Sequence, residues 1–329
     1  MAFSMRAHAG VATKEEEEAE KEVDEIVSRM RSDYAGASNH VVAFSGGVDS
    51  SLTLALVHRA FPTSTRAVIG RSAALPKLQL RLARKVAGGI GVGLQEVETN
   101  EGESQGYVKN EGQACYYCKT ALYTTLEKVF ENVRADRLSA SGSAADPSVV
   151  LYNGTNMDDL QDPTRVGLMA AAKHNVCSPL SGLAKADVRR LAKHLKLPNH
   201  NYAASPCLRS RLEFGVEATS DHLRRIERGE EFIRDALSLG VEVDMRLRLL
   251  AGGKAMVELA TDCDLSVERD KLMAAGLDHF LTEELSFNSW DIRPFKSGGV
   301  AKVIEVDWTN HTPSSLSSKP LSSQSSLDG

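Results

Sequence analysis

The stretch VVAFSGGVDS, from Val41 to Ser50, decides the fold of this chain. Its first four residues are apolar and predict a buried strand, whereas residues 50–60 predict a helix. Gly46 and Gly47, between the two, let backbone amides approach a polyanion closely because no Cβ stands in the way. The free N–H groups and the positive dipole end of the helix favour an anion at the same place. The stretch therefore predicts a pyrophosphate-binding loop.

Other side chains of this loop extend the candidate ATP site. Ser45, Ser50 and Ser51 can donate hydroxyl hydrogen bonds to phosphate oxygens. Asp49 places a carboxylate beside the anion, so we expect it to help hold Mg²⁺ or to order the loop. The structural alternative is a tight turn with a Ser/Asp helix cap. No Gly-Lys-Ser/Thr follows a spaced glycine, so this is not a Walker A loop.

Strands alternate with helices around the loop. Further strands are predicted at residues 66–69, 94–97 and 149–152, and helices at residues 14–33, 76–86 and 116–130. Residues 134–148 are interpreted as a surface insertion. The alternation indicates an α/β domain with a mostly parallel sheet covered by helices on both faces.

The character of the sequence changes after Pro198. Residues 199–215 show little periodicity, which is typical of a long ordered loop. A small C-terminal α+β domain is predicted from a charged helix at 220–239, a hairpin of residues 245–250 and 255–259, a helix at 266–274 and a strand at 280–285.

These patterns divide the chain into five predicted parts. They are an N-terminal tail with an amphipathic helix (1–37), an ATP-binding domain (38–198), a loop (199–219), a small substrate or oligomerisation domain (220–308) and a disordered serine-rich tail (309–329).

Composition narrows the class of protein. The 329 residues carry a formal net charge of -5, which argues against general nucleic-acid binding. Five irregularly spaced cysteines do not resemble a secreted disulfide framework, and reduced thiols suit the cytoplasm. No apolar run approaches the ~18 residues of a membrane span. We expect a cytoplasmic protein that binds neither membranes nor nucleic acids.

A second constellation follows the predicted strand at 149–152. Gly154 and Asn156 lie where that strand ends, at the sheet edge where ligands of such folds bind. Ser72 holds the corresponding place after the second strand, and all three are candidate ATP contacts. Asp158 and Asp159 offer carboxylates for a metal or a ribose, although either one is equally suited to capping the next turn.

Four cations are candidate ligands for phosphates or carboxylates. Lys119 and Arg165 can neutralise phosphates, with a solvated surface role as the alternative. Arg246 and Arg248 alternate on a predicted strand, so their side chains share one face of the sheet. Two parallel guanidiniums suit bidentate binding of an anion. The alternative is an exposed sheet face.

Cys207 is the candidate nucleophile. It lies in a proline-containing loop and is followed by Arg209 and Arg211, and nearby cations favour the nucleophilic thiolate. A thiolate can displace AMP from an adenylated carboxyl group. An inert loop cysteine is the alternative.

One Cys-x-x-Cys pair, Cys115 and Cys118, stays unassigned. With His174 and Cys177 it gives a weak zinc signal, and structural, redox and sulfur-handling roles are equally open.

Two resemblances add to these residues. The glycine loop resembles that of the PP-loop ATP pyrophosphatases, which cleave ATP between the α- and β-phosphates and pass AMP to a carboxyl or carbonyl oxygen. Residues 115–123, 154–167 and 205–215, in this order and with residues 178–180 and Lys185 between them, resemble the LarE family. LarE enzymes are ATP-dependent sacrificial sulfurtransferases of nickel-pincer nucleotide synthesis. The resemblance covers residues 20–300.

The resemblance implies a reaction and further site residues. ATP and Mg²⁺ would adenylate a carboxylate of a pyridinium mononucleotide, and Cys207 would give up its sulfur to form a thiocarboxylate. The substrate-binding residues it implies, besides the four cations and two carboxylates above, are Ser210, Arg211, Glu230 and Glu258. Some relatives hold an iron–sulfur cluster with three cysteines. Only Cys207 lies in this loop, so the sacrificial version is implied, in a homo-oligomer for which a hexamer is a natural size.

Three alternatives remain open on the sequence. A PP-loop synthetase or amidotransferase, similar to NAD or GMP synthetases, would use ammonia as its nucleophile and would not need Cys207. A tRNA-thiolating enzyme would share the loop, but the chain shows no basic nucleic-acid module. A nucleotide-binding module without catalysis would keep the loop and show no ATP turnover.

Overall fold

A four-stranded parallel sheet forms the centre of the larger domain. The computed structural model describes residues 13–141, 148–203, 206–260, 262 and 264–296. Strand order is β3-β2-β1-β4, with β1 at Asn39–Ala43, β2 at Thr65–Arg71, β3 at Leu94–Glu98 and β4 at Val149–Tyr152. All five residues of β1 are buried, as expected for a strand paired on both sides.

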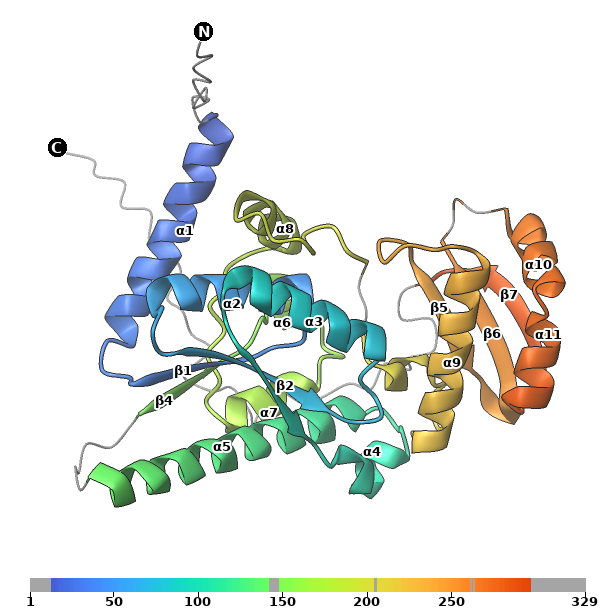
Figure 1. The fold of residues 1–329 in the computed structure, drawn as a ribbon, viewed down its shortest axis with the longest axis horizontal. Helices are drawn as coiled ribbons and strands as arrows, with labels where there is room; N and C mark the ends of the chain where they lie inside the picture. The colour runs from blue at the N-terminus through green and yellow to red at the C-terminus, as the bar shows by residue number, and fades with distance from the viewer. Residues whose placement is uncertain (1–12, 142–147, 204–205, 261, 263, 297–329) are drawn as a thin grey trace, which may run out of the picture.

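Helices cover both faces of this sheet (Figure 1). One core lies under α1 (Lys14–Asp33), α2 (Val48–Ala60), α3 (Lys77–Ile90) and α8 (Lys185–His194). A second core lies under α5 (Ala114–Ser141) and α7 (Gly167–Lys173). The predicted α/β class with a sheet covered on both sides is confirmed.

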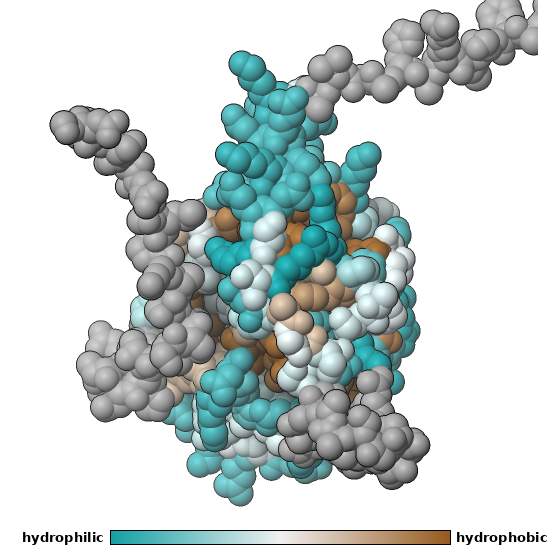
Figure 2. All heavy atoms as spheres, turned by 90° about the vertical axis from the view of Figure 1, so that its left-hand side faces the viewer, coloured by the Kyte–Doolittle hydropathy of each residue, from teal (hydrophilic) through white to brown (hydrophobic). Residues whose placement is uncertain are grey.

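The amphipathic helix predicted near the N-terminus is α1. The Thr13 hydroxyl accepts a hydrogen bond from the N–H of Glu16, and the Glu16 carboxylate accepts one from the N–H of Thr13 at 2.8 Å. The buried side includes Val23, Ile26 and Met30. Figure 2 shows that the projecting part of α1 is hydrophilic, with apolar residues below it where it joins the body of the domain.

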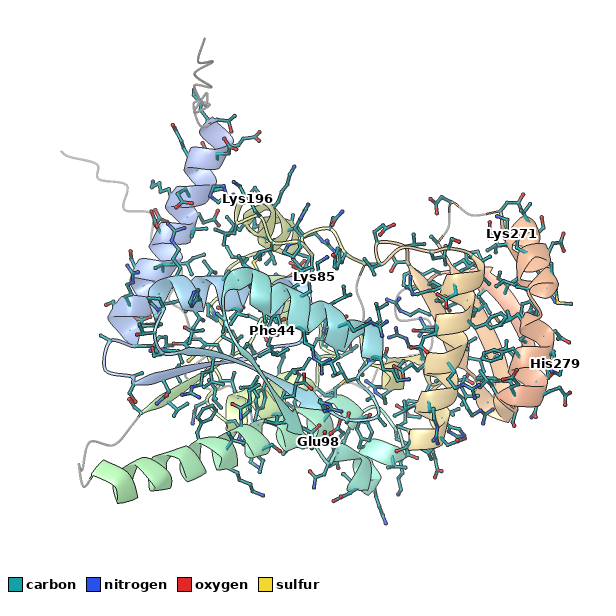
Figure 3. All side chains as sticks on the ribbon, viewed as in Figure 1. Phe44, Lys85, Glu98, Lys196, Lys271 and His279 are labelled. Carbon is teal, nitrogen blue, oxygen red and sulfur yellow. The ribbon has the colours of Figure 1, made fainter. Side chains whose placement is uncertain are left out.

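The C-terminal domain has a three-stranded mixed sheet. β5 (Met245–Leu249) pairs antiparallel with β6 (Lys254–Leu259), and β6 pairs parallel with β7 (Ser289–Pro294). Its helices are α9 (Ser220–Ala236), α10 (Leu265–Ala274) and α11 (Leu277–His279). In Figure 3, Lys271 and His279 mark the outer side of this domain, away from the parallel sheet. The predicted small α+β domain is confirmed.

Short elements complete the two domains and the segment between them. They are α4 (Gln105–Val108), α6 (Met157–Gln161) and the 3-10 turns Glu101–Glu103, Leu208–Arg211 and Ala251–Gly253. α3 and α4 lie on the side of the larger domain that faces α9 (Figure 1). The carboxylate of Glu227 in α9 accepts a hydrogen bond from the N–H of Lys77 at 2.6 Å, which ties the start of α3 to the smaller domain.

Two predicted elements are wrong. Residues 280–285 form no strand: Phe280–Glu284 is a π-helix, and Leu281 and Leu285 are buried at the i, i+4 spacing of a helix. The third strand of this sheet is β7 instead. The surface insertion predicted at 134–148 is, up to Ser141, the continuation of α5. Residues 142–147, the N-terminal residues 1–12 and the predicted serine-rich tail lie outside the described residues.

Among the helices of the described ranges, none combines the length and the apolar character that a bilayer crossing requires.

Candidate functional site

The glycine loop joins β1 to α2 as predicted, and it fits closely against α3. Gly46 has a φ of +73°, and an ideal Cβ there would lie 2.8 Å from the Cα of Ala83. The side-chain amide of Gln79 donates a hydrogen bond to the carbonyl of Ser45 at 2.6 Å. Gly47 caps α2 without a side-chain hydrogen bond, so the first amides of α2 have no capping oxygen. The turn therefore leaves the amides at the start of α2 uncapped, which is the geometry that the predicted anion site requires.

Hydroxyl groups of the loop bond to the loop itself. The Ser50 hydroxyl donates to the Gly47 carbonyl at 3.0 Å and accepts from the Ser45 N–H at 3.2 Å. The hydroxyls of Ser45 and Ser50 are 3.1 Å apart. Ser51 is fully buried, and its oxygen accepts a hydrogen bond from the Asn199 amide at 2.9 Å. These serines hold the shape of the loop, which leaves backbone amides as its anion donors.

The end of β4 meets the start of α2. An ideal Cβ at Gly154 would lie 2.6 Å from the backbone nitrogen of Ser50, so only glycine fits. Asn156 then donates its amide to the Asp49 carboxylate at 3.0 Å. The two predicted motifs, about a hundred residues apart in the chain, thus form one site.

Asp49 is engaged by a lysine that the sequence analysis did not select. The ammonium of Lys185, the first residue of α8, contacts both carboxylate oxygens of Asp49. Its side chain is 37% exposed, so the charge also lies within reach of an incoming anion. Within the described residues, no group of three or more His, Cys, Asp and Glu side chains is arranged to hold a metal ion. Asp49 therefore belongs to no such group, and its carboxylate is engaged by Lys185.

The two aspartates after Asn156 have structural partners. Asp159 completes a capping box with Asn156 at the start of α6 and pairs with Arg165 at 2.6 Å. Asp158 accepts a hydrogen bond from the N–H of Lys185 at 3.3 Å. The capping alternative thus describes Asp159, and Arg165 neutralises that carboxylate in this structure.

Ser72 and Lys119 lie near the same edge of the sheet. The Ser72 hydroxyl accepts a hydrogen bond from the N–H of Ala74 at 3.2 Å and shapes the turn after β2. Lys119 extends from the first turns of α5, and its pKa is raised by its interactions with Tyr123 first and then with the thiol of Cys118. Lys119 therefore keeps its positive charge close to sulfur atoms.

Cys207 is half-buried and directly precedes the 3-10 turn Leu208–Arg211. The N–H of Leu208 donates to the carbonyl of Ala74 at 2.8 Å, which attaches this loop to the segment between β2 and α3. Cys207 and Cys118 pack against the same apolar core of the smaller domain. A cysteine of the unassigned Cys-x-x-Cys pair therefore shares the surroundings of the predicted nucleophile.

The two arginines beside Cys207 have other partners. The guanidinium of Arg209 donates to the sulfur of Cys115 at 2.8 Å. Arg211 is 1% exposed, and its Nε pairs with Glu230 at 2.9 Å while its Nη1 donates to the carbonyl of Cys207 at 3.2 Å. In this structure the hydrogen bond of Arg209 therefore goes to the thiol of Cys115, and Arg211 orients the backbone of Cys207.

The implied substrate residues of this loop are also bonded within the protein. The Ser210 hydroxyl donates to the carbonyl of Cys207 at 2.7 Å. Glu230 accepts from the N–H of Leu247 at 3.1 Å as well as from Arg211, and so joins α9 to β5. In this structure Ser210, Arg211 and Glu230 fix the loop that carries the thiol.

A buried network surrounds the two arginines of β5. Glu258 is fully buried and binds Arg248 through one oxygen and Arg293 through the other, each at 2.6 Å. Arg246 is 4% exposed and lies over the ring of Phe295, and burial lowers its pKa to about 10. Because both Arg246 and Arg248 are buried, the exposed-face alternative does not describe them. Arg248 also donates to the Ser210 carbonyl at 3.0 Å.

The possible zinc set does not assemble. His174 pairs with Glu127 at 2.8 Å, and Cys177 packs against the core on the α1 side of the sheet. Cys115 lies on α5, against Arg209. Of the four residues, only the Cys-x-x-Cys pair stays together.

Two surface hollows lie outside this site. A groove along α1 is lined by glutamates on the α1 side and by His194 and Lys196 across from them. A smaller hollow lies between Arg189, Tyr202 and Phe295. None of the predicted site residues lines either hollow.

Sequence reasoning missed three residues that hold the loops together. Lys185 was named only within a resemblance, and its place at the start of α8, which follows α6 and α7 in the chain, gave no local signal of a site. Asn199 is 1% exposed and donates to the Gly46 carbonyl at 2.8 Å as well as to Ser51. Buried Glu101 lies beside Cys118. No local pattern distinguishes Asn199 or Glu101.

Comparison with known proteins finds relatives but assigns no family. No protein-family model matches the chain. It is 28% identical over 280 residues to the uncharacterized protein slr1717 of Synechocystis, covering 84% of this chain and 97% of that protein. It is also 28% identical over 205 residues to the uncharacterized protein MJ0830 of Methanocaldococcus jannaschii, covering 62% and 72% respectively. The parallel sheet is consistent with a Rossmann-like fold.

Proposed function

We propose that this protein is a PP-loop ATP pyrophosphatase of the LarE type, which adenylates a carboxylate of a pyridinium mononucleotide and transfers sulfur to it. The observation that supports this most is the convergence of Gly46, Gly154 and Lys185 at the start of α2. Two glycines there admit a close polyanion, and one lysine can neutralise it. The loop that carries Cys207 is attached to the larger domain by the hydrogen bond from the Leu208 N–H to the Ala74 carbonyl.

The ATP half of the reaction rests on the loop. Backbone amides at the start of α2 would hold the β- and γ-phosphates, and Lys185 would move from Asp49 to the polyphosphate. Asp49 would then be free to contribute to Mg²⁺ binding, which explains a carboxylate beside an anion. The acceptor carboxylate attacks the α-phosphorus, pyrophosphate leaves, and an acyl-adenylate results.

The sulfur half rests on Cys207. Its sulfur attacks the acyl carbon, a C–S bond forms, and the C–O bond to AMP breaks. Loss of the Cα proton and cleavage of the Cβ–S bond then release a thiocarboxylate and leave dehydroalanine in the chain. In this scheme, Arg211 and Ser210 hold the Cys207 carbonyl while the side chain reacts.

A three-cysteine version of the chemistry fits this structure less well. Some LarE relatives hold an iron–sulfur cluster with three cysteines, and Cys115, Cys118 and Cys207 do gather in one region around Arg209. The inference from a single cysteine in the loop therefore overlooked two thiols from α5. Within the described residues, however, no three such side chains are arranged for a metal. The proposal keeps the sulfur of the protein as the source.

Intact-protein mass spectrometry tests this proposal. The protein is incubated with ATP, Mg²⁺ and the pyridinium dicarboxylate mononucleotide. We expect at most one sulfur transferred per chain and a product lighter by the mass of hydrogen sulfide, with the loss at the peptide of Cys207. Cys207→Ala should still release pyrophosphate but transfer no sulfur, whereas Cys177→Ala should behave as the wild type.

Other outcomes would select the alternatives. Sulfur transfer with no loss of mass would point to a cluster or an external sulfur donor. Ammonia-dependent product formation by Cys207→Ala would instead identify a synthetase. No ATP turnover at all would leave a nucleotide-binding module.

A further inference from the structure

Three thiols from two distant segments lie in one region beside the smaller domain. Cys115 and Cys118 lie one helical turn apart at the start of α5, on the same face. Arg209, two residues after Cys207, donates to the sulfur of Cys115 at 2.8 Å. Cys118 and Cys207 pack against the same apolar core. The proposed reaction uses only the thiol of Cys207, so it does not explain why the other two lie there.

Cys118 differs from the others in its surroundings. Burial, followed by the neighbouring Cys207 and Glu101, raises the pKa of its thiol to about 12, so it stays protonated at neutral pH. Its S–H points to an oxygen of Glu101 at 3.9 Å. Cys115, by contrast, is exposed. Cys118 is thus a protected thiol with a single acceptor for its proton.

Glu101 is an unusual neighbour for a buried thiol. It is 4% exposed, and its second carboxylate oxygen is buried without a hydrogen-bond partner. The hydroxyl of Tyr107, 2% exposed, is also buried without one. A carboxylate oxygen kept free beside a thiol can accept a proton when that thiol reacts. These two orphaned groups distinguish the pocket from an ordinary apolar site for cysteine.

We propose that Cys118 is the redox partner of Cys207, with which it closes a reversible disulfide that withholds the sulfur of Cys207. In this scheme Cys207, in its loop, reacts first with the oxidant, and Cys118 is the resolving thiol. Glu101 acts as the proton acceptor for Cys118. Control of sulfur transfer by this disulfide rests on the proposed function, whereas formation of the disulfide does not.

The reaction balances with a small disulfide as oxidant. The Cys207 thiolate attacks oxidised glutathione, which forms a mixed disulfide and releases one glutathione thiolate. Cys118 then attacks the sulfur of Cys207, Glu101 takes the Cys118 proton, and the second glutathione thiolate leaves. Two protein thiols are oxidised by two electrons, and one glutathione disulfide is reduced to two thiols. A dithiol reductant reverses both steps.

Disulfide mapping on the full chain tests the proposal. The protein is incubated with oxidised glutathione, its remaining thiols are alkylated, and the digest is analysed by mass spectrometry. We expect the peptides of Cys118 and Cys207 to be linked, and dithiothreitol to release them. In Cys118→Ser, Cys207 should instead retain glutathione. In Glu101→Gln, closure of the disulfide should be slower by about tenfold or more, since a positioned base is lost.

Cys115→Ser is the matched control, since it removes the other thiol of the same helical face. It should leave the link between Cys118 and Cys207 unchanged. A link from Cys115 to Cys207, or full alkylation of both Cys118 and Cys207 after oxidation, would overturn the proposal. The experiment needs neither ATP nor acceptor, so a protein that forms the link but transfers no sulfur after reduction would refute the proposed function and leave the disulfide standing.

Discussion

The glycine loop at Gly46 and the loop of Cys207 are held in place by different kinds of contact. Gly46 and Gly154 allow backbone segments to approach closer than any Cβ would permit. The loop of Cys207 is held by charged side chains, chiefly Arg211 on Glu230 and Arg248 on Glu258. The glycine loop depends on residues that lack a Cβ, and the loop of Cys207 depends on the pairing of buried charges. Substitutions should therefore damage them in different ways.

Gly46→Ala should give the largest effect on activity. The new methyl group would collide with the backbone of Ala83, and a φ of +73° disfavours any side chain. We expect ATP-dependent pyrophosphate release to fall by about 100-fold or more, since small displacements of binding groups cost that much. Gly88→Ala in α3, where a Cβ meets nothing within 4 Å, is the control and should keep its activity. Equal activity in both variants would show that the tight loop does not bind ATP.

Glu258→Gln should instead reduce stability. It leaves Arg248 and Arg293 without a buried counter-charge, and breaking a buried ion pair costs about 3–5 kcal/mol. Urea unfolding should show this loss in the free energy of unfolding. The control is Lys271→Ala, which removes an exposed pair with Glu268 and should cost less than about 0.5 kcal/mol. If Glu258→Gln is as stable as the wild type and binds acceptor more weakly, these arginines form a substrate clamp instead.

Lys185→Met tests whether the lysine serves the anion or only Asp49. We expect the KM for ATP to rise about tenfold or more, because a charged hydrogen bond contributes about 1.5–3 kcal/mol. Circular dichroism should show an intact fold. Lys173→Met, on the exposed end of α7, should bind ATP normally. An unchanged KM in Lys185→Met would confine the role of Lys185 to Asp49.

The smallest effect is a pH dependence at the base of the sheet. His40 in β1 is fully buried, its Nδ1 lies 2.9 Å from the Tyr152 hydroxyl, and burial lowers its pKa. Below about pH 6.5 the unfolded chain gains a proton that the folded chain resists, so stability should decline as the pH falls. The decline is at most about 1.4 kcal/mol per pH unit for one group. Urea unfolding between pH 5 and about pH 8 measures it.

Replacement of the histidine separates its contribution from that of other groups. His40→Gln should flatten the slope below about pH 6.5, whereas exposed His279, on α11, should leave it unchanged when replaced by Gln. An identical slope in wild type and His40→Gln would show that His40 does not sense pH.

The sequence predicted the parallel sheet and the loop because their determinants are local. Four apolar residues before two glycines define both β1 and the start of α2. It failed at residues 280–285, where a short apolar run has the length of a strand but buries Leu281 and Leu285 with helical spacing. It also missed the end of α5, although Ala, Arg and Leu in residues 131–141 favour helix.

The site around Cys207 was harder to predict because its contacts are long-range. Arg209 lies beside Cys207 in the sequence but reaches the sulfur of Cys115 in α5. Arg248 was placed correctly on a strand. Its link through Glu258 to Arg293, however, depends on how β5, β6 and β7 pair. Local chemistry identifies candidate side chains, and the pairing of segments decides which charges remain available to a ligand.

The hydrogen bond from Leu208 to the carbonyl of Ala74 has a mechanical consequence. Ala74 lies just before α3, and Ala83 within α3 forms the wall against Gly46. A tilt of α3 would therefore displace both the wall of the glycine loop and the anchor of the Cys207 loop. Helix α3 also contacts α9 through Lys77 and Glu227, so strain applied to the smaller domain would be transmitted along α3 to the glycine loop.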